Sequence, residues 1–318
     1  MKNGRPKIIA LDIGATHIRV SYYSDGRFSK FGTDDTPRTG NSKSCVTDKI
    51  ISLIYDRLSE EEIKSASSIG AASAGPLDTK KGEIINSPNM AFTRIEIKKA
   101  LRDEFSKDVY LINDCRSGVL GEIASDESLA DKNVVYITFS TGIGAGAFID
   151  GNLILGKSGN AGEAGHFFVD SRYNLSCSCG GVGHWEAYSS GTKIPVFFRE
   201  FCRQNNYKCD IAPDASAETI FLGIKNKSRI YSEFAEELGK INSRGISTVV
   251  CAYSPDVIIL DGPVVLNNTD VIIKGINRYT DRYLDMPQIR PGRLKGLAPL
   301  HGAAFYALNM QNKRGEND

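Results

Sequence analysis

The sequence lacks long hydrophobic runs and carries almost no excess of charge of either sign. No apolar stretch approaches the ~20 residues that a helix needs to cross a bilayer, and the first residues pass from a short basic stretch into a strand-like run without a signal-peptide core. Its 39 basic and 38 acidic residues leave a formal charge of +1, which gives no electrostatic reason to expect a nucleic acid or an anionic membrane as partner. We therefore expect a cytoplasmic protein whose ligand is small.

The cysteines do not form an obvious disulfide framework, because there are seven of them, an odd number. Two of them, Cys177 and Cys179, lie close together beside histidines. The others stand singly in apolar or helical contexts and are typical of small buried side chains in a reducing compartment: Cys45, Cys115, Cys202, Cys209 and Cys251.

Strand-like and helical patterns alternate along the 318 residues, which are enough for two α/β domains. We expect strands at residues 7–12, 17–23, 68–72, 109–112, 133–139 and 257–260, and helices at 47–64, 95–105, 194–205, 228–252 and from His301 onward. One unit, a strand, a glycine-rich turn, a second strand and an Asp-Gly hairpin, occurs twice, at residues 7–26 and 133–151. This repetition indicates a duplicated α/β domain whose two copies face each other across a cleft.

The two glycine-rich turns, residues 12–16 and 140–146, are candidate phosphate loops. A dinucleotide-binding fingerprint would need a helix directly after the turn, whereas β-type sequence follows here. A turn of this kind can present backbone N–H groups to a phosphate, although each turn taken alone also fits a plain hairpin. Thr16 and Thr141 would add hydroxyl donors, and Asp12 at a strand end could hold Mg²⁺ through water.

Asp114 is the candidate catalytic base. It follows an apolar strand at residues 109–112 and Asn113, and ligands of open α/β sheets gather at the carboxyl ends of strands. The alternative is an aspartate that caps the next helix. An aspartate in a partly desolvated cleft is suited to accept a hydroxyl proton during phosphoryl transfer.

A cluster of cysteine and histidine occupies residues 160–190. His166, Cys177, Cys179 and His184 would supply two thiolates and two imidazoles for a closed, structural Zn²⁺ site. Such a site would pin the loop that carries Glu163 and Glu186. The alternative is a redox-inert pair of cysteines with unrelated histidines.

In this order along the chain, five motifs resemble those of the ROK family (repressors, open reading frames, sugar kinases): Asp12-Ile-Gly14-Ala15-Thr16, Asn113-Asp114, Ser140-Thr141-Gly142-Ile-Gly144-Ala-Gly146, Glu163-Ala-Gly-His166 and Cys177-Ser-Cys179-Gly-Gly-Val-Gly-His184-Trp-Glu186. The resemblance covers nearly the whole chain. It implies an actin-like ATPase (ribonuclease H-like) fold, with a smaller domain at residues 1–115 plus 300–318 and a larger domain at 116–299. It also implies a homodimer.

The resemblance also implies a role for each matching residue, with ATP, Mg²⁺ and a structural Zn²⁺ as cofactors. Asp114 matches the catalytic base, and Gly262 matches the adenosine side. The residues that match sugar ligands or frame the sugar are Gly75, Asn89, Asn113, Glu163, His166 and Glu186. The phosphate loops correspond to Asp12, Gly14, Ala15, Thr16, Thr141, Gly142 and Gly144. The zinc set corresponds to His166, Cys177, Cys179 and His184.

Three positions depart from the family pattern. His184 stands where the family usually has a third cysteine, and imidazole is an acceptable Zn²⁺ ligand. The sugar loop at residues 89–92 is one residue shorter than the usual Asn-Leu-Pro-Gly-Trp and has no Pro-Gly-Trp. The tripeptide at 261–263, Asp-Gly-Pro, replaces a more glycine-rich turn near adenosine.

The sequence therefore predicts an ATP-dependent kinase for the 6-hydroxyl of a hexose or N-acetylhexosamine. N-acetylmannosamine is favoured over glucose, because the altered loop after Asn89 could make room for an acetamido group. A sugar-responsive repressor is the alternative from another class, but the first strand begins at Lys7, which leaves no room for a preceding helix-turn-helix. An actin-like filament would not need the sugar-facing set and is the least favoured.

Overall fold

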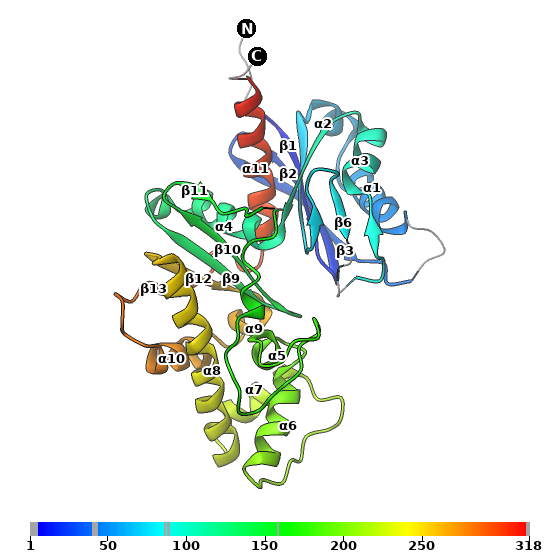
Figure 1. Cartoon of the computed structure of the whole chain (residues 1–318). Helices are drawn as coiled ribbons and strands as arrows, with labels where there is room; N and C mark the ends of the chain where they lie inside the picture. The colour runs from blue at the N-terminus through cyan, green and yellow to red at the C-terminus, as the bar shows by residue number, and fades with distance from the viewer. Residues whose placement is uncertain (1–5, 40–43, 86, 88–89, 158, 316–318) are drawn as a thin grey trace. The chain divides into compact units, whose positions relative to one another are not determined.

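The computed structural model describes residues 6–39, 44–85, 87, 90–157 and 159–315 (Figure 1). The chain divides into two compact units. The first comprises Met1–Ala130, Leu153–Ala161 and Leu297–Asp318, and the second comprises Asp131–Asn152 and Gly162–Gly296. A domain boundary after residue 115 would fall inside helix α4 (Asp114–Ser125), which lies wholly in the first unit.

The main sheet of the first unit has the strand order β3-β2-β1-β4-β8. These strands are β1 (Ile8–Ile13), β2 (His17–Ser24), β3 (Arg27–Asp35), β4 (Ser68–Ser73) and β8 (Asp108–Asn113). β1 pairs antiparallel with β2 and parallel with β4, and β4 pairs parallel with β8. Every residue of β1 and β4 is buried, as expected for central strands covered on both faces.

The second unit repeats this arrangement with the order β11-β10-β9-β12-β13. Its strands are β9 (Val134–Phe139), β10 (Ile143–Ile149), β11 (Asn152–Leu153), β12 (Val257–Asp261) and β13 (Gln288–Pro291). β9 pairs antiparallel with β10 and parallel with β12, as β1 does with β2 and β4. The predicted duplication of a strand-turn-strand-hairpin unit is therefore confirmed at the level of topology.

Both predicted Asp-Gly hairpins are present. Asp25 and Gly26 have φ of 52° and 81°, and Asp150 and Gly151 have φ of 50° and 75°. Positive φ at both central residues is the signature of a type I′ turn, whose twist matches that of the flanking strands. The predicted glycine turn at 140–146 is wrong in its extent, because Ile143 already begins β10 and the later glycines pair within the sheet.

The helices of the first unit are α1 (Cys45–Arg57), α2 (Glu60–Ser65), α3 (Ile97–Phe105), α4 and α11 (Ala298–Gly315), with the short 3₁₀ helix η1 (Glu127–Leu129) and a small sheet of β5 (Leu77–Asp78), β6 (Glu83–Ile85) and β7 (Arg94–Ile95). The single helix predicted at 47–64 is wrong. Ser59 starts a new helix because its hydroxyl accepts from the Glu62 N–H while the Glu62 carboxylate accepts from the Ser59 N–H, a capping box.

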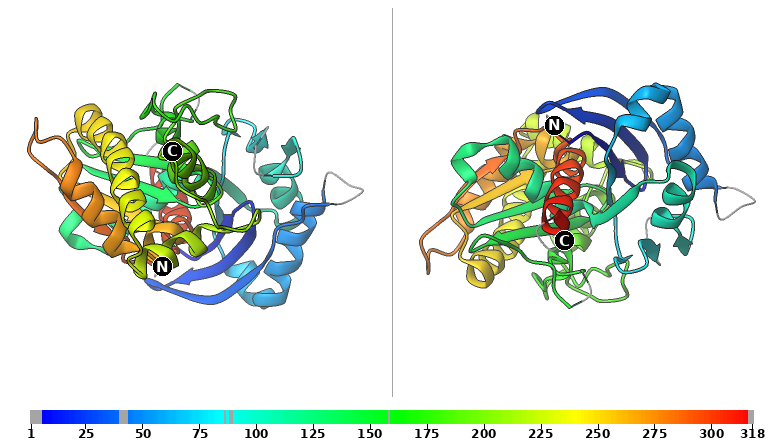
Figure 2. Two further views of the ribbon diagram at one scale, coloured as in Figure 1. Left: turned by 90° about the horizontal axis from the view of Figure 1, so that it is seen from below. Right: turned by 90° about the horizontal axis from the view of Figure 1, so that it is seen from above.

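Helix α11 packs against α4 and the main sheet of the first unit (Figures 1 and 2). Glycines permit this close approach: a Cβ on Gly302 would overlap the Ser117 carbonyl, and one on Gly121 would stand 2.1 Å from the Ala298 carbonyl oxygen. α4 is therefore held between its own strand β8 and the last helix of the chain.

The second unit contains η2 (Ala164–His166), α5 (Glu186–Ser189), α6 (Ile194–Gln204), α7 (Ala217–Lys225), α8 (Arg229–Tyr253), α9 (Pro263–Leu266) and α10 (Thr269–Tyr279). Phe197, Phe198 and Phe201 of α6 pack their rings around Phe234 of α8. Within the described residues, none of the helices has the length and apolar character to span a bilayer.

Candidate functional site

Asp12 lies at the end of β1 beside the first glycine turn. Its side chain is 6% exposed, and its Oδ2 accepts a hydrogen bond from Arg19 Nη1 at 2.8 Å. Arg19 is its direct partner on β2. Burial raises the pKa of Asp12 above its ordinary value, and the Arg19 charge opposes that rise without cancelling it. The turn itself is fixed by backbone bonds from Gly14 N–H to the His17 carbonyl and from Thr36 N–H to the Thr16 carbonyl.

The second turn, residues 140–142, joins β9 to β10. Glu186, the first residue of α5, accepts the Ile143 N–H with Oε2 at 3.0 Å and the Ser178 hydroxyl with Oε1 at 3.0 Å. A Cβ on Gly142 would stand 2.3 Å from Glu186 Oε2. The glycine therefore lets this carboxylate reach the turn. A sugar hydroxyl would have to use the remaining lone pairs of Glu186.

Asn113 and Asp114 stand at the junction of β8 and α4. The Asn113 side-chain oxygen accepts the N–H groups of Cys115 and Arg116, at 3.0 and 3.3 Å, and so caps the helix. Asp114 is the first residue of the helix, half-buried, with its Oδ1 2.8 Å from the Cys115 nitrogen. The cap that the sequence left as the alternative for Asp114 is supplied mainly by Asn113.

Gly75 and Glu163, two further residues of the set that matches sugar ligands or frames the sugar, lie outside helices and strands. A Cβ on Gly75 would come 3.4 Å from Asn113 Nδ2, so the Gly75 loop and the end of β8 are neighbours in the first unit. Glu163 is exposed and directly precedes η2, which ends at His166. Asn89 lies outside the described residues. Beyond it, Met90 and Phe92 pack against the core of the first unit.

The four cysteine and histidine residues come together in the second unit. The donor atoms of His166, Cys177, Cys179 and His184 all lie within 4.8 Å of one another. Cys177 Sγ is 3.6 Å from His166 Nδ1, and Cys179 Sγ is 3.2 Å from His184 Nδ1. Tetrahedral ligands about 2.0–2.3 Å from a Zn²⁺ ion are roughly 3.5 Å apart. The donor set and its spacing therefore fit zinc.

Backbone pairing assembles this cluster. Cys177 N–H donates to the Gly181 carbonyl and Gly180 N–H donates to the Cys177 carbonyl, which closes a tight turn. Phe168 and His184 form an antiparallel bridge. A Cβ on Gly181 would stand 2.3 Å from the His184 ring, so glycine is required for that ring to lie over the turn.

The segment 170–188, which carries Cys177 and Cys179, packs on α8. The Trp185 indole donates to Asn242 Oδ1 at 2.8 Å, and a Cβ on Gly245 would stand 2.3 Å from the same ring. Asp170 accepts the Tyr188 hydroxyl at 3.0 Å and pairs with Arg244 at 3.3 Å. The loop thus rests on a long helix rather than on flexible chain.

Gly262 lies between β12 and α9 with a φ of 88°, and a Cβ there would stand 2.4 Å from the Phe139 carbonyl oxygen. Asp261 is fully buried; it accepts the Gly262 N–H at 2.7 Å and the Tyr136 hydroxyl at 2.9 Å. Asp261, the residue that departs from the family pattern, therefore holds this turn against β9.

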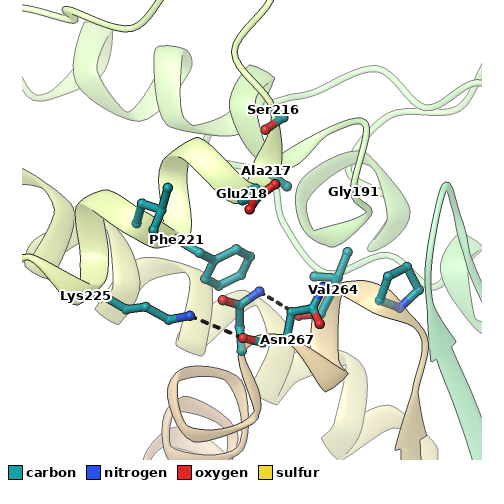
Figure 3. Close-up of a pocket in the computed structure, with 11 residues that line it drawn as sticks. Gly191, Ser216, Ala217, Glu218, Phe221, Lys225, Val264 and Asn267 are labelled. Atoms are coloured by element: carbon teal, nitrogen blue, oxygen red, sulfur yellow. Dashed lines mark hydrogen bonds between the residues drawn. The ribbon is translucent and has the colours of Figure 1, made fainter. Parts of the chain in front are cut away.

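A pocket of about 500 Å³ opens beside Gly262 in the second unit (Figure 3). Its lining residues are Gly191, Ser216, Ala217, Glu218, Phe221, Leu222, Lys225, Pro263, Val264, Asn267 and Asn268. Gly191 N–H also donates to the Ser140 carbonyl at 2.8 Å, so one wall of the pocket is bonded to the second turn. The sequence analysis predicted no helix at residues 217–225 and so missed the contribution of α7 to the pocket.

Comparisons with known proteins agree on one family. The profile of the ROK family matches residues 8–310. A glucokinase of Pyrobaculum calidifontis is 31% identical over 304 residues, 95% of each chain. The xylose repressor of Bacillus subtilis is 31% identical over 278 residues, 85% of this chain and 68% of the repressor.

Solved structures show the same fold. The ROK hexokinase of Thermus thermophilus superposes with a TM-score of 0.78 at 24% identity, covering 96% of this chain and 99% of that one. A ROK glucokinase of Streptomyces griseus, in complex with glucose and AMPPNP, gives a TM-score of 0.76 at 23% identity, covering 94% and 98%. The predicted actin-like ATPase fold is confirmed.

Proposed function

The chain belongs to the ROK family and is an ATP-dependent sugar kinase, and from this premise we propose that it transfers the γ-phosphate of ATP to the 6-hydroxyl of a hexose or N-acetylhexosamine. The observation that carries the proposal is the pocket beside Gly262, which is joined to the turn at 140–142 through Gly191. A nucleoside pocket next to a glycine turn is the arrangement that a bound nucleoside triphosphate requires.

The pocket would hold the adenosine. Figure 3 shows Phe221 and Lys225 extending from α7 toward the side formed by Val264 and Asn267. An aromatic and aliphatic wall suits a purine ring, and the polar groups at the rim suit a ribose. The Ser140 N–H is used within the turn, where it donates to the Gly142 carbonyl at 2.8 Å, so the N–H groups of Thr141 and Gly142, with the Thr141 hydroxyl, would be the ones to face the phosphates.

Asp114 would accept the proton of the sugar hydroxyl. As that oxygen bonds to the γ-phosphorus, the bond from phosphorus to the β-phosphate oxygen breaks and ADP leaves. Asn113 orients Asp114 by fixing the first turn of α4. The family resemblance implies that Gly75 frames the sugar and that its other hydroxyls would be bound by Asn89, Asn113, Glu163, His166 and Glu186. When bound with ATP, Mg²⁺ would neutralise phosphate charge, and Asp12 is placed at a strand end where its carboxylate could hold it through water.

His166, Cys177, Cys179 and His184 would hold a structural Zn²⁺. Four protein ligands leave no open position for a reacting water, so the metal would fix the loop and take no part in the chemistry. His166 would then serve both as a ligand and as a neighbour of the sugar. The family resemblance also implies a homodimer, which stays a prediction.

Two sugars are the leading substrates. Glucose is the substrate in the names of related enzymes. N-acetylmannosamine is supported by the shortened loop, where Met90 and Phe92 turn toward the core and no Pro-Gly-Trp follows Asn89. Turnover of MgATP with glucose, N-acetylmannosamine and N-acetylglucosamine separates them, and turnover with glucose alone would overturn the preference for the acetylated sugar.

Asp114→Asn tests the mechanism. The amide preserves the shape of the side chain but cannot accept the proton, so kcat should fall by roughly two or more orders of magnitude while sugar binding is kept. Steady-state kinetics and calorimetry of sugar binding measure the two effects. Turnover close to that of the wild type would remove Asp114 from the role of base.

A further inference from the structure

Residues 159–161 contact two parts of the first unit, the segment around β5 and helix α4. Gly159 has a φ of 75°, and a Cβ there would stand 2.9 Å from Thr79 Cγ2. Asn160 is bonded to Leu77, and Ala161 is bonded to Arg116. Such dense attachment is unusual for a connecting segment without helix or strand structure.

The Asn160 side chain pairs with both backbone groups of Leu77. Its Oδ1 accepts the Leu77 N–H at 3.2 Å, and its Nδ2 donates to the Leu77 carbonyl at 3.2 Å. This two-point contact mimics a strand pairing and defines a unique register. Leu77 lies two residues after Gly75, and a Cβ on Gly75 would be 3.9 Å from Asn160 Oδ1. Asn160 therefore fixes the loop that we assign to framing the sugar.

Arg116 anchors the same segment from α4. Its side chain is 1% exposed, and its Nη2 donates to the Ala161 carbonyl. Arg116 lies two residues after Asp114, and its own N–H is held by the Asn113 cap. A buried guanidinium costs desolvation free energy that an apolar side chain of similar size would not.

The chain passes into the second unit immediately after this anchor. Ala161 is the last residue of its segment in the first unit, and Gly162 is the first residue of the second. The Gly162 carbonyl accepts the Ala145 N–H at 2.8 Å, and its φ is 93°. The Ala161 carbonyl is thus fixed within the first unit and the Gly162 carbonyl within the second, directly before Glu163.

We propose that Arg116 and Asn160 are positioning residues for sugar binding. They fix residues 159–161, and through them the Gly75–Leu77 loop and the point from which the chain leads to Glu163. Neither residue contacts the reacting atoms in this role, and the inference rests on the proposed function. Loss of either anchor should loosen the sugar subsite and leave the nucleotide pocket of the second unit intact.

The test compares Arg116→Met, Arg116→Lys and Asn160→Ala with the wild type. Arg116→Met and Asn160→Ala should raise the KM for the sugar about tenfold or more, as expected when substrate-positioning contacts are loosened, with the KM for ATP unchanged. Arg116→Lys keeps one cationic donor and should recover part of the loss. Hydrogen exchange of residues 159–163 should speed up in Arg116→Met and Asn160→Ala.

Ser117→Ala is the matched control. Ser117 is the next residue of α4, is fully buried and donates to a backbone carbonyl, that of Pro299, at 2.6 Å. Ser117→Ala removes a bond of the same kind, but this bond anchors α11 and not residues 159–161. Ser117→Ala should lower the Tm while leaving the sugar KM and the exchange of residues 159–163 as in the wild type.

The outcomes separate this inference from the proposed function. If the wild type is active but Arg116→Met and Asn160→Ala leave the sugar KM unchanged, or raise the KM for ATP as much as the KM for the sugar, the positioning role is overturned. If the wild type turns over no sugar, the proposed function fails. Hydrogen exchange then still tests whether Arg116 and Asn160 fix residues 159–161. Unchanged exchange in Arg116→Met and Asn160→Ala overturns this role, and faster exchange supports it.

Discussion

Asp12 is a buried carboxylate, and its burial disfavours the charged form. Its pKa is raised mainly by desolvation, even though Arg19 lies 2.8 Å away. For a carboxyl whose folded pKa is raised, the stabilising contribution is fully present below the unfolded pKa and is lost as the pH rises through the folded pKa. At neutral pH the raised pKa of Asp12 therefore lowers the stability of the fold relative to that at low pH, a cost that would be offset if Asp12 holds a cation with ATP as proposed.

We expect Asp12→Asn to be at least as stable as the wild type at pH 7 and to lose about tenfold or more in kcat with MgATP, because positioned charge beside the phosphates is lost. The gain in stability should shrink as the pH falls from the raised pKa of Asp12 toward the ordinary carboxyl pKa, and it should be absent below that value, where Asp12 is protonated in both the folded and the unfolded state. Thermal unfolding across pH measures this. A less stable Asp12→Asn at pH 7 would show that the ion pair with Arg19 outweighs the burial.

Asp34→Asn is the control for the same chemical change. Lys49 holds the pKa of Asp34 below its ordinary value, so the contribution of Asp34 is present above the unfolded pKa and is lost as the pH falls. This variant should be slightly less stable than the wild type at neutral pH, the opposite sign from Asp12→Asn, with unchanged kcat.

At the scale of elements, the proposed metal would fix the loop that carries Cys177 and Cys179 together with the adjoining helix α5. We expect one Zn²⁺ per chain by elemental analysis, lost in Cys177→Ser together with several degrees or more of Tm, because metal binding is part of the folding free energy of such loops. Cys251→Ser makes the same change at an exposed cysteine outside the cluster and should keep both zinc and Tm.

Substitutions of His184 test whether histidine can serve as the zinc ligand where the family usually has a third cysteine. His184→Cys should keep the zinc, because a thiolate can take the place of the imidazole, and His184→Ala should weaken zinc binding by about tenfold or more. Zinc content unchanged in His184→Ala would mean that His184 is not a ligand. A wild-type protein that is folded and free of zinc would contradict the site as a whole.

Local patterns in the sequence were enough for the elements that local chemistry determines. Asp25-Gly26 and Asp150-Gly151 predict type I′ hairpins because few other residues tolerate two successive positive φ values. Ser59 and Glu62, spaced as in a capping box, also indicate the break between α1 and α2. The helical pattern that continues across residues 47–64 concealed this signal. The cysteine and histidine cluster was found because its ligands are near in sequence.

Contacts between distant segments could not be predicted in this way. Arg116 and Ala161 are 45 residues apart, and nothing in the local pattern of either shows that a buried arginine will reach that carbonyl. The same holds for Phe221 and Lys225, which line the pocket only because α7 packs beside α9. The family resemblance identified motifs, whereas the pocket wall and the anchors come from tertiary packing.

At the scale of the whole molecule, the pocket proposed for adenosine and the turn at 140–142 belong to the second unit, whereas Asp12, Asp114 and Gly75 belong to the first. A ligand that binds the native state stabilises it by about 2.7 kcal/mol when its concentration is 100 times its Kd. Nucleotide and sugar should therefore each raise the Tm of the wild type when added alone.

Gly262→Ala should separate the two ligands. The new Cβ would stand 2.4 Å from the Phe139 carbonyl oxygen at a φ of 88°, so the turn beside the pocket must shift. We expect this variant to lose the Tm increase caused by AMPPNP and to keep the increase caused by the sugar. Gly151→Ala imposes a similar strain, at a φ of 75° with open space around it, and should keep both increases. Loss of the sugar response alone in Gly262→Ala would contradict the assignment of the nucleotide to this pocket, since Gly262 directly precedes Pro263, which lines it.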